Sequence, residues 1–178
     1  DDVVQVDHDN VGACKELVTV LFAKGIQNIA YLGSNMDQMV NRCRYQGYEE
    51  AYRKGKRKLN QDLVYTDLSS KAMVEKAVEE LKKSGVECIL CQDDYICDEA
   101  VRKLSHMGVR IPDQMKVASC HYSRILENYP VTVTSLKFNI TELGRRSCQV
   151  LLDMIHGKTV PDKTLLDYEI ILKESTKG

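Results

Sequence analysis

The sequence predicts an α/β protein built on a doubly wound parallel sheet. Short apolar segments typical of buried strands alternate with longer segments typical of helices from one end of the chain to the other. Successive strand–helix units joined by short loops place their strands parallel, because each helix returns the chain to the starting edge of the sheet. At 178 residues, the chain is long enough for one large domain or two small ones.

Capping residues and glycines delimit the helices of the first half of the chain. Asp9 and Asn10 can cap a helix by accepting a hydrogen bond from its first turn, and Gly25 can end that helix in the left-handed conformation. Ser69 and Ser70 are suitable caps for a later helix. The elements predicted here are, in order, a strand at 3–6, a helix at 10–24, a strand at 26–32, a helix reaching about 54, a strand at 63–66 and a helix at 70–84.

The second half repeats this pattern. The run 87–91 is largely apolar, as in a strand that is covered on both faces, and Asp93 and Asp94 can cap the helix that follows it. Gly108 then ends that helix. The remaining elements predicted are strands at 87–91, 115–119 and 131–135, helices at 95–107 and 141–155, and a final strand at 165–172.

The elements divide unevenly into one complete lobe and part of another. Residues 26–120 form an unbroken block of strand–helix units, whereas the flanking segments are too few to close a second sheet. We therefore predict a complete lobe over 25–135, to which 161–178 returns, and a partial lobe made of 1–24 and 136–160. We then expect two sets of apolar helix residues to be exposed, because the partial lobe offers nothing to pack against them. These are positions 17, 18 and 21 of the first helix and positions 150, 151 and 154 of the last.

Composition excludes several classes of function. With 25 basic and 26 acidic residues the net charge is −1, so the chain has no basic field for nucleic acid. No apolar run approaches the roughly 18 residues of a membrane span, and no signal peptide is visible. The odd count of seven cysteines, spread through apolar segments, is typical of reduced thiols in a cytoplasmic protein. No membrane partner is predicted.

Ligands of open α/β sheets bind beyond the carboxyl ends of the strands. This rule selects the loops at 33–35, 66–67, 92–94 and 120–122, whose polar side chains suit a polar ligand. Asp94 is more easily interpreted as a helix cap than as a ligand contact, and Asp93 is equally compatible with both roles. Arg44, on the helix after the first loop, can reach the same edge, although its spacing alone favours a solvated surface charge.

No catalytic or metal-binding constellation emerges. Cys88 and Cys91 form a CxxC pair, but positions three apart on a strand point to opposite faces, which disfavours a metal site. The adjacent pair Cys120 and His121 is separated in the same way, which disfavours thiol catalysis. Phosphate-loop and dinucleotide motifs are also missing. We predict neither an enzyme nor a bound cofactor.

A set of short motifs, in a fixed order, resembles the lactose-repressor family of bacterial transcription regulators. Each motif is weak, but together they extend over nearly the whole chain. They are Asp9-Asn10-x2-Ala13, Lys24-Gly25-x2-Asn28-Ile29-Ala30-x-Leu32-Gly33, Arg44-x2-Gly47-Tyr48, Gly108-Val-Arg-Ile-Pro-Asp113, Pro130-Val-Thr-Val-Thr134, Leu143-Gly144 and Leu172-Lys-Glu-Ser-Thr176.

The resemblance implies the effector-binding and dimerisation domain of such a regulator. Its fold would be periplasmic-binding-protein-like, type I, with crossovers between lobes near residues 25, 135 and 161. A small-molecule effector, a sugar or a related compound, would occupy the cleft between the lobes. The protein would form a homodimer in the cytoplasm and contact operator DNA only through a helix-turn-helix absent from this chain.

The resemblance also implies a set of ligand-binding residues. Arg44 would hold ligand hydroxyls, and Asp93, His121, Phe138 and Asn10 would line the cleft. His121 stands where the family usually has an aspartate, and Phe138 replaces a frequent glutamine. A carboxylate accepts hydrogen bonds from two hydroxyls, whereas a neutral histidine offers one donor and one acceptor. These two positions therefore depart from the family's usual sugar site.

Two other classes of protein share the predicted fold. A sugar-binding component of a transporter would be exported and would contain few free thiols, so the seven cysteines and the lack of a visible signal disfavour it. An enzyme of flavodoxin-like architecture would need a nucleophile, a base and an orienting group, and the sequence offers no such set. The regulator remains the leading hypothesis.

Overall fold

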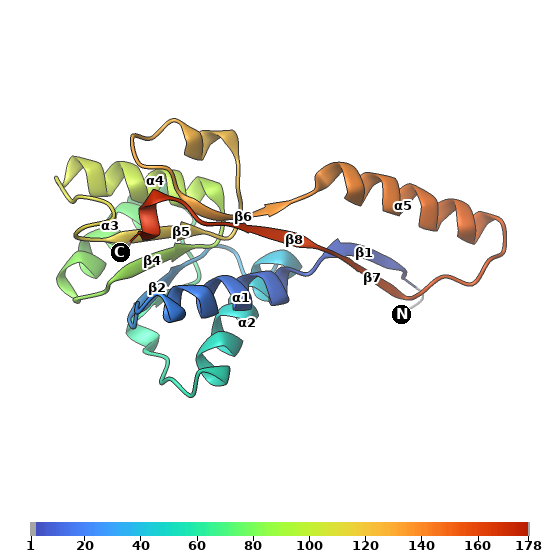
Figure 1. Cartoon of the computed structure of the whole chain (residues 1–178), viewed down its shortest axis with the longest axis horizontal. Coiled ribbons are helices and arrows are strands. Elements are labelled where there is room, and N and C mark those ends of the chain that lie inside the picture. The colour runs from blue at the N-terminus through green and yellow to red at the C-terminus, as the bar shows by residue number, and fades with distance from the viewer. Residues whose placement is uncertain (1–2, 178) are drawn as a thin grey trace.

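A six-stranded sheet forms the larger part of the molecule (Figure 1). The computed structural model describes residues 3–177. The strand order is β3-β2-β4-β5-β6-β8, and all neighbours are parallel except β8, which pairs antiparallel with β6. The strands are β2 (Ile29–Leu32), β3 (Val64–Tyr65), β4 (Cys88–Cys91), β5 (Lys116–Ser119), β6 (Thr134–Phe138) and β8 (Tyr168–Ile171).

Helices cover both faces of this sheet, which confirms the doubly wound fold. Helices α1 (Asn10–Ala23) and α2 (Met39–Lys54) pack on one face, and α3 (Lys71–Lys83) and α4 (Asp94–His106) pack on the other. Side chains of β4 alternate between the two cores. Cys88 belongs to the core beneath α1 and α2, and Cys91 to the core beneath α3 and α4, as the strand geometry predicted.

A smaller sheet and one helix extend away from the six-stranded sheet (Figure 1). Strands β1 (Gln5–His8) and β7 (Lys163–Leu166) pair in parallel, and α5 (Ile140–Ile155) contacts β1. The chain passes between the two parts at Asp9, Asn139 and Asp167. These crossings differ from the expected positions near 25, 135 and 161, because α1 packs on the larger sheet, β6 continues to Phe138, and β7 and β8 are separate strands.

Helix α1 belongs with the larger sheet, which differs from the predicted division of the chain. Leu17, Val18 and Leu21 are fully buried between α1, α2 and the sheet, rather than lacking cover. Of the segment 1–24 assigned to the partial lobe, 5–8 lie in the small sheet and 10–23 in the larger part. Residues 1–2 of that segment, and residue 178 of the final one, lie outside the described residues.

The exposed apolar face predicted for the later helix is present on α5. Leu151 and Met154 are 57% and 44% exposed, whereas Val150, expected on the same face, is buried. Single 3₁₀ turns occupy Gln61–Leu63, Arg124–Glu127 and Glu174–Thr176. None of the helices in residues 3–177 combines the length and hydropathy of a membrane span.

Candidate functional site

Arg44 lies buried at the carboxyl end of the sheet, although its spacing alone suggested a surface charge. Its side chain projects from the first half of α2, and the residue is only 8% exposed. Nε donates to Asn10 Oδ1 at 3.2 Å, and Nη1 donates to the Gln92 carbonyl oxygen at 2.9 Å. Asn10 is itself held by Nδ2, which donates to the His8 carbonyl oxygen at 3.2 Å. The guanidinium thus joins α1 to the end of β4.

Gln92 is a buried residue of the site that was not predicted from the sequence to have a role of its own. It follows β4 directly and is fully buried. Its Oε1 accepts from the Ser34 backbone amide at 3.2 Å, and its Nε2 donates to Ser34 Oγ at 3.1 Å. These bonds tie the loop after β2 to the loop after β4. Its position in the sequence could have indicated this role. Gln92 is a polar residue immediately after an apolar strand, and it lies in one of the loops that the rule for strand ends selects.

Asp93, for which the sequence left both roles open, is the helix cap, and Asp94 is not. Asp93 is the cap of α4, with extended backbone angles, and its Oδ1 accepts from the Ile96 amide at 2.9 Å. Asp94, expected to be the cap, instead places Oδ1 3.1 Å from Nδ1 of His121. Burial alone would raise the pKa of the Asp94 carboxyl, but interactions with the nearby Ser123 and His121 side chains outweigh burial and lower that pKa below its ordinary value.

His121 and Cys120 point away from each other, as the strand geometry predicted. Ser119 Oγ fixes the backbone here by donating to the His121 carbonyl oxygen at 2.8 Å and accepting from the His121 amide at 3.2 Å. Cys120 is fully buried, with its Sγ 3.5 Å from Cys14 Sγ. The thiol therefore belongs to the core, and the imidazole belongs to the polar edge of the sheet.

Phe138 lies at the centre of the predicted residues. Its ring centroid is 4.9 Å from that of His8 and 6.4 Å from that of His121, to which it is nearly parallel. The guanidinium carbon of Arg44 lies 5.8 Å from the same ring centroid. The structure therefore brings together a set that we call the Arg44 cluster: Asn10, Arg44, Asp94, His121 and Phe138. Asp93, the other predicted member, serves as the adjacent helix cap.

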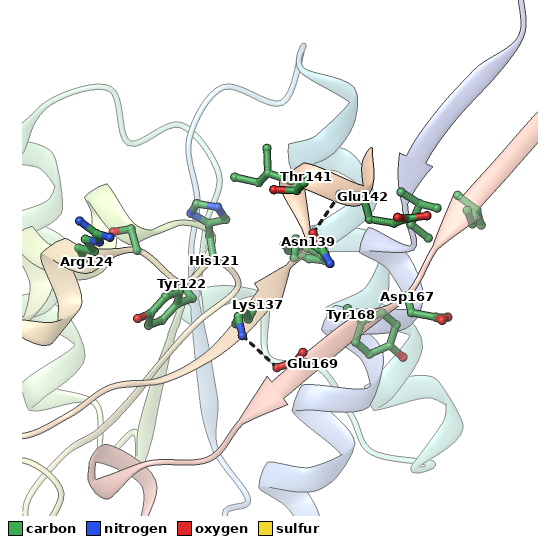
Figure 2. Close-up of a pocket in the computed structure, with 15 residues that line it drawn as sticks. His121, Tyr122, Arg124, Lys137, Asn139, Thr141, Glu142, Asp167, Tyr168 and Glu169 are labelled. Atoms are coloured by element: carbon green, nitrogen blue, oxygen red, sulfur yellow. Dashed lines mark hydrogen bonds and ion pairs between the residues drawn. The ribbon is translucent and has the colours of Figure 1, made fainter. Parts of the chain in front are cut away.

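A hollow of about 800 Å³ opens beside the Arg44 cluster, at the crossings between the two sheets. Its lining comes from residues 121–124, 137–142 and 165–169, so it shares His121 and Phe138 with the cluster (Figure 2). Among its lining residues, Lys137 Nζ lies 3.3 Å from Glu169 Oε2, which joins β6 to β8 (Figure 2). Within residues 3–177, no group of three or more His, Cys, Asp or Glu side chains is placed to hold a metal ion.

Buried polar groups at the carboxyl ends of a doubly wound sheet, next to a hollow, define a ligand-binding α/β domain. The second sheet, reached through the crossings, adds a further wall to this hollow. The chain belongs to the periplasmic binding protein-like domain family, which matches residues 18–176.

Regulators of transcription are prominent among the similar proteins. HTH-type transcriptional regulator CelR of Thermobifida fusca is 27% identical over 178 residues, a match that spans 98% of this chain and 52% of the relative. HTH-type transcriptional regulator GntR of Escherichia coli K12 is 26% identical, over 91% of this chain and 49% of the relative. The chain thus spans about half the length of these relatives, which confirm the resemblance to the lactose-repressor family.

A solved structure of a similar protein holds a sugar. The structure of a transcriptional regulator CelR–cellobiose complex has a TM-score of 0.86 at 26% identity. The match covers 97% of this chain and 54% of that one. The fold of residues 3–177 is therefore that of an effector-binding domain of this family.

Proposed function

We propose that this chain is the effector-binding part of an HTH-type transcriptional regulator and that its effector, a small polar molecule, binds at the Arg44 cluster. The observation that carries the proposal is the buried guanidinium of Arg44, held by Asn10 and Gln92 at the carboxyl ends of the strands. Such a preorganised donor loses little conformational entropy when a ligand binds. The cellobiose in the CelR complex supports a sugar or a related compound as the effector class.

The position of the cluster explains how a ligand would act on the rest of the protein. Asn10 adjoins the first crossing between the sheets, and Phe138 immediately precedes the second. His8 Nε2 and the Asn139 carbonyl oxygen, 3.3 Å apart, bring these two crossings together. A ligand held here contacts both parts of the molecule, so it favours the relative orientation in which its contacts are best. By favouring one orientation of the two parts, the bound ligand changes the affinity of the regulator for DNA.

The remaining partners of the regulator follow from this assignment. Operator DNA binds to a helix-turn-helix domain of the full-length protein, since this chain carries a net charge of −1. The regulator is a homodimer in the cytoplasm, and it catalyses no reaction. The relatives named above are regulators rather than components of transporters, which favours this function over the alternative with the same fold.

Calorimetric titration of the full-length regulator with a panel of monosaccharides and disaccharides, cellobiose included, tests the proposal. A buried hydrogen bond to a charged group is worth about 1.5–3 kcal/mol, so Arg44→Ala should weaken binding by roughly ten- to a hundredfold. The matched control is Arg102→Ala on α4, whose guanidinium is exposed and pairs with Asp98. If no member of the panel binds, or if Arg44→Ala binds as tightly as the original chain, the proposal is wrong.

A further inference from the structure

The turn that ends α2 concentrates positive charge on an otherwise acidic chain. Five of the six positions 53–58 are basic, and together we call them the basic turn: Arg53, Lys54, Lys56, Arg57 and Lys58. The rest of the chain then holds 20 basic and 26 acidic residues. The turn follows α2 at the lower edge of Figure 1, whereas the small sheet and α5 extend to the right. Arg57 donates to the side chain of Gln27, which precedes β2, so the basic turn lies at the amino end of the sheet and away from the Arg44 cluster.

Four of these five charges have no acidic partner within residues 3–177. Arg53 is the member that pairs with a carboxylate, at 3.7 Å from Glu50, and the three lysines are exposed to solvent. The helix dipole stabilises cations in the last turn of a helix. That effect accounts for Arg53 and Lys54 but not for the three cations beyond the end of α2. Like charges this close repel one another, so the stability of the fold does not explain the cluster.

Lys56 occupies a backbone position that favours glycine. Its φ is 53°, in the left-handed region, and within the described part of the chain it is the one residue other than glycine with a positive φ. Two hydrogen bonds hold this turn, because the Lys56 and Arg57 amides donate to the Arg53 and Tyr52 carbonyl oxygens at 3.1 and 2.9 Å. Helices commonly end in this way with glycine at the left-handed position. A strained residue of this kind is found most often where a protein contacts a ligand or a partner.

A hollow of about 320 Å³ between the ends of α1 and α2 borders the basic turn. Its lining includes the apolar Phe22, Ala23 and Ala51 together with Lys54 and Arg57. The guanidinium carbon of Arg57 lies 4.3 Å from the centroid of the Phe22 ring, and Phe22 is only 9% exposed. The ring is therefore covered, which leaves no open aromatic face on which a nucleic-acid base could stack. The hollow instead has room for an apolar side chain beside several cations.

We infer that the basic turn and this hollow bind an acidic segment of another protein that carries an apolar anchor residue. The carboxylates of the segment lie against Lys54, Lys56 and Lys58, and the anchor enters the hollow beside Phe22. Charges that face each other across such an interface speed association and select the partner, and salt weakens them. Because this surface is separate from the Arg44 cluster, the partner and the effector can bind to the same molecule at once.

Fluorescence anisotropy of a labelled oligoglutamate peptide with one central leucine tests the inference on the full-length protein. Lys54→Glu combined with Lys58→Glu should weaken binding by about tenfold, because two attractions become repulsions. The matched control is Lys82→Glu combined with Lys83→Glu, which makes the same charge change at exposed positions of α3. Lys56→Gly should weaken binding about two- to fivefold and yet raise the melting temperature, since glycine adopts a positive φ without strain. Circular dichroism spectra show whether each variant is folded.

The peptide itself provides the test of the hollow. Serine in place of the central leucine should weaken binding by about tenfold, because an apolar side chain gains free energy when it leaves water. Equal binding of the two peptides would overturn the role of the hollow.

Four other outcomes would overturn the inference as a whole. They are a leucine peptide that does not bind, an affinity that is unchanged in Lys54→Glu/Lys58→Glu, and an equal loss in the control variant. The fourth is a labelled duplex DNA whose affinity falls by a larger factor than that of the peptide in the same variant, since the surface would then bind nucleic acid. Sedimentation of the protein alone covers the remaining occupant. If Lys54→Glu/Lys58→Glu dissociates an oligomer and no peptide binds, the surface is a contact between copies of this chain and the inference is wrong.

Discussion

Gly47 offers a direct test of how α1 and α2 pack. A Cβ atom built on Gly47 would lie 2.4 Å from the Val11 carbonyl oxygen, 2.9 Å from Cys14 Cβ and 3.0 Å from the Lys15 backbone nitrogen. Two of these atoms belong to the backbone of α1, which cannot move without shifting the helix. We therefore expect Gly47→Ala to force the two helices apart and to lower the free energy of unfolding.

The magnitude follows from two opposing effects. Overpacking against rigid atoms costs about 3 kcal/mol, at the upper end of the usual range. Replacing a helical glycine by alanine returns about 1 kcal/mol. The net loss is about 2 kcal/mol, or a fall in melting temperature of roughly 4–8 °C for a chain of this length.

Urea unfolding followed by circular dichroism measures this loss, and Gly144 provides the matched control. Gly144 also lies within a helix, α5, but apart from its chain neighbours and the nearby backbone of α5 itself no atom lies within 4 Å of a Cβ built there. Gly144→Ala should therefore raise the stability of its helix by about 0.5–1 kcal/mol. If Gly47→Ala is as stable as the unmodified chain, the close approach of α1 and α2 is not a constraint on this fold.

Three further predictions concern the pH dependence, the core and the exposed helix. Because its folded-state pKa is lowered, Asp94 stabilises the fold above its ordinary value of about 4, and this contribution is lost as the pH falls through the lowered value. Asp94→Asn should therefore flatten the acid end of a curve of melting temperature against pH; an unchanged curve would contradict the pairing with His121. Tyr48→Phe removes a buried hydroxyl that donates to a β2 carbonyl oxygen at 2.7 Å, and should cost about 1 kcal/mol in urea unfolding. Leu151 and Ile155 are 57% and 68% exposed on α5, so the chain should self-associate, and lysine at both positions should reduce this in sedimentation equilibrium. A monomeric parent chain at tens of micromolar would refute the last prediction.

The helix boundaries could be predicted because they depend on nearby residues. Asp9 caps α1 by accepting from the Gly12 amide at 2.8 Å, and Ser70 caps α3 by accepting from the Met73 amide at 3.4 Å. Gly25 and Gly108 follow α1 and α4 with φ of 89° and 66°, in the left-handed region. The cap of α4 could not be predicted in this way, because Asp93 and Asp94 are adjacent and either one can serve as a cap.

The candidate site could be predicted in part. The rule for strand ends selected the loops that contain Gln92 and His121, because the edge at which parallel strands end follows from their connections alone. The family resemblance added Arg44, Asn10 and Phe138. What each residue contacts could not be predicted, since the bonds of Arg44 join residues 34 and 48 positions apart.

The sequence by itself determined the alternation of strands and helices, the parallel sheet and the edge at which polar groups gather. These features follow from hydrophobic periodicity and from hydrogen bonds between near neighbours. Only the tertiary structure decided that α1 packs against α2, so that its apolar face is buried, and that Arg44 is buried among neutral partners. Burial depends on which surfaces meet when the whole chain is folded, and the apolar faces of α1 and α5 look alike until their partners are known.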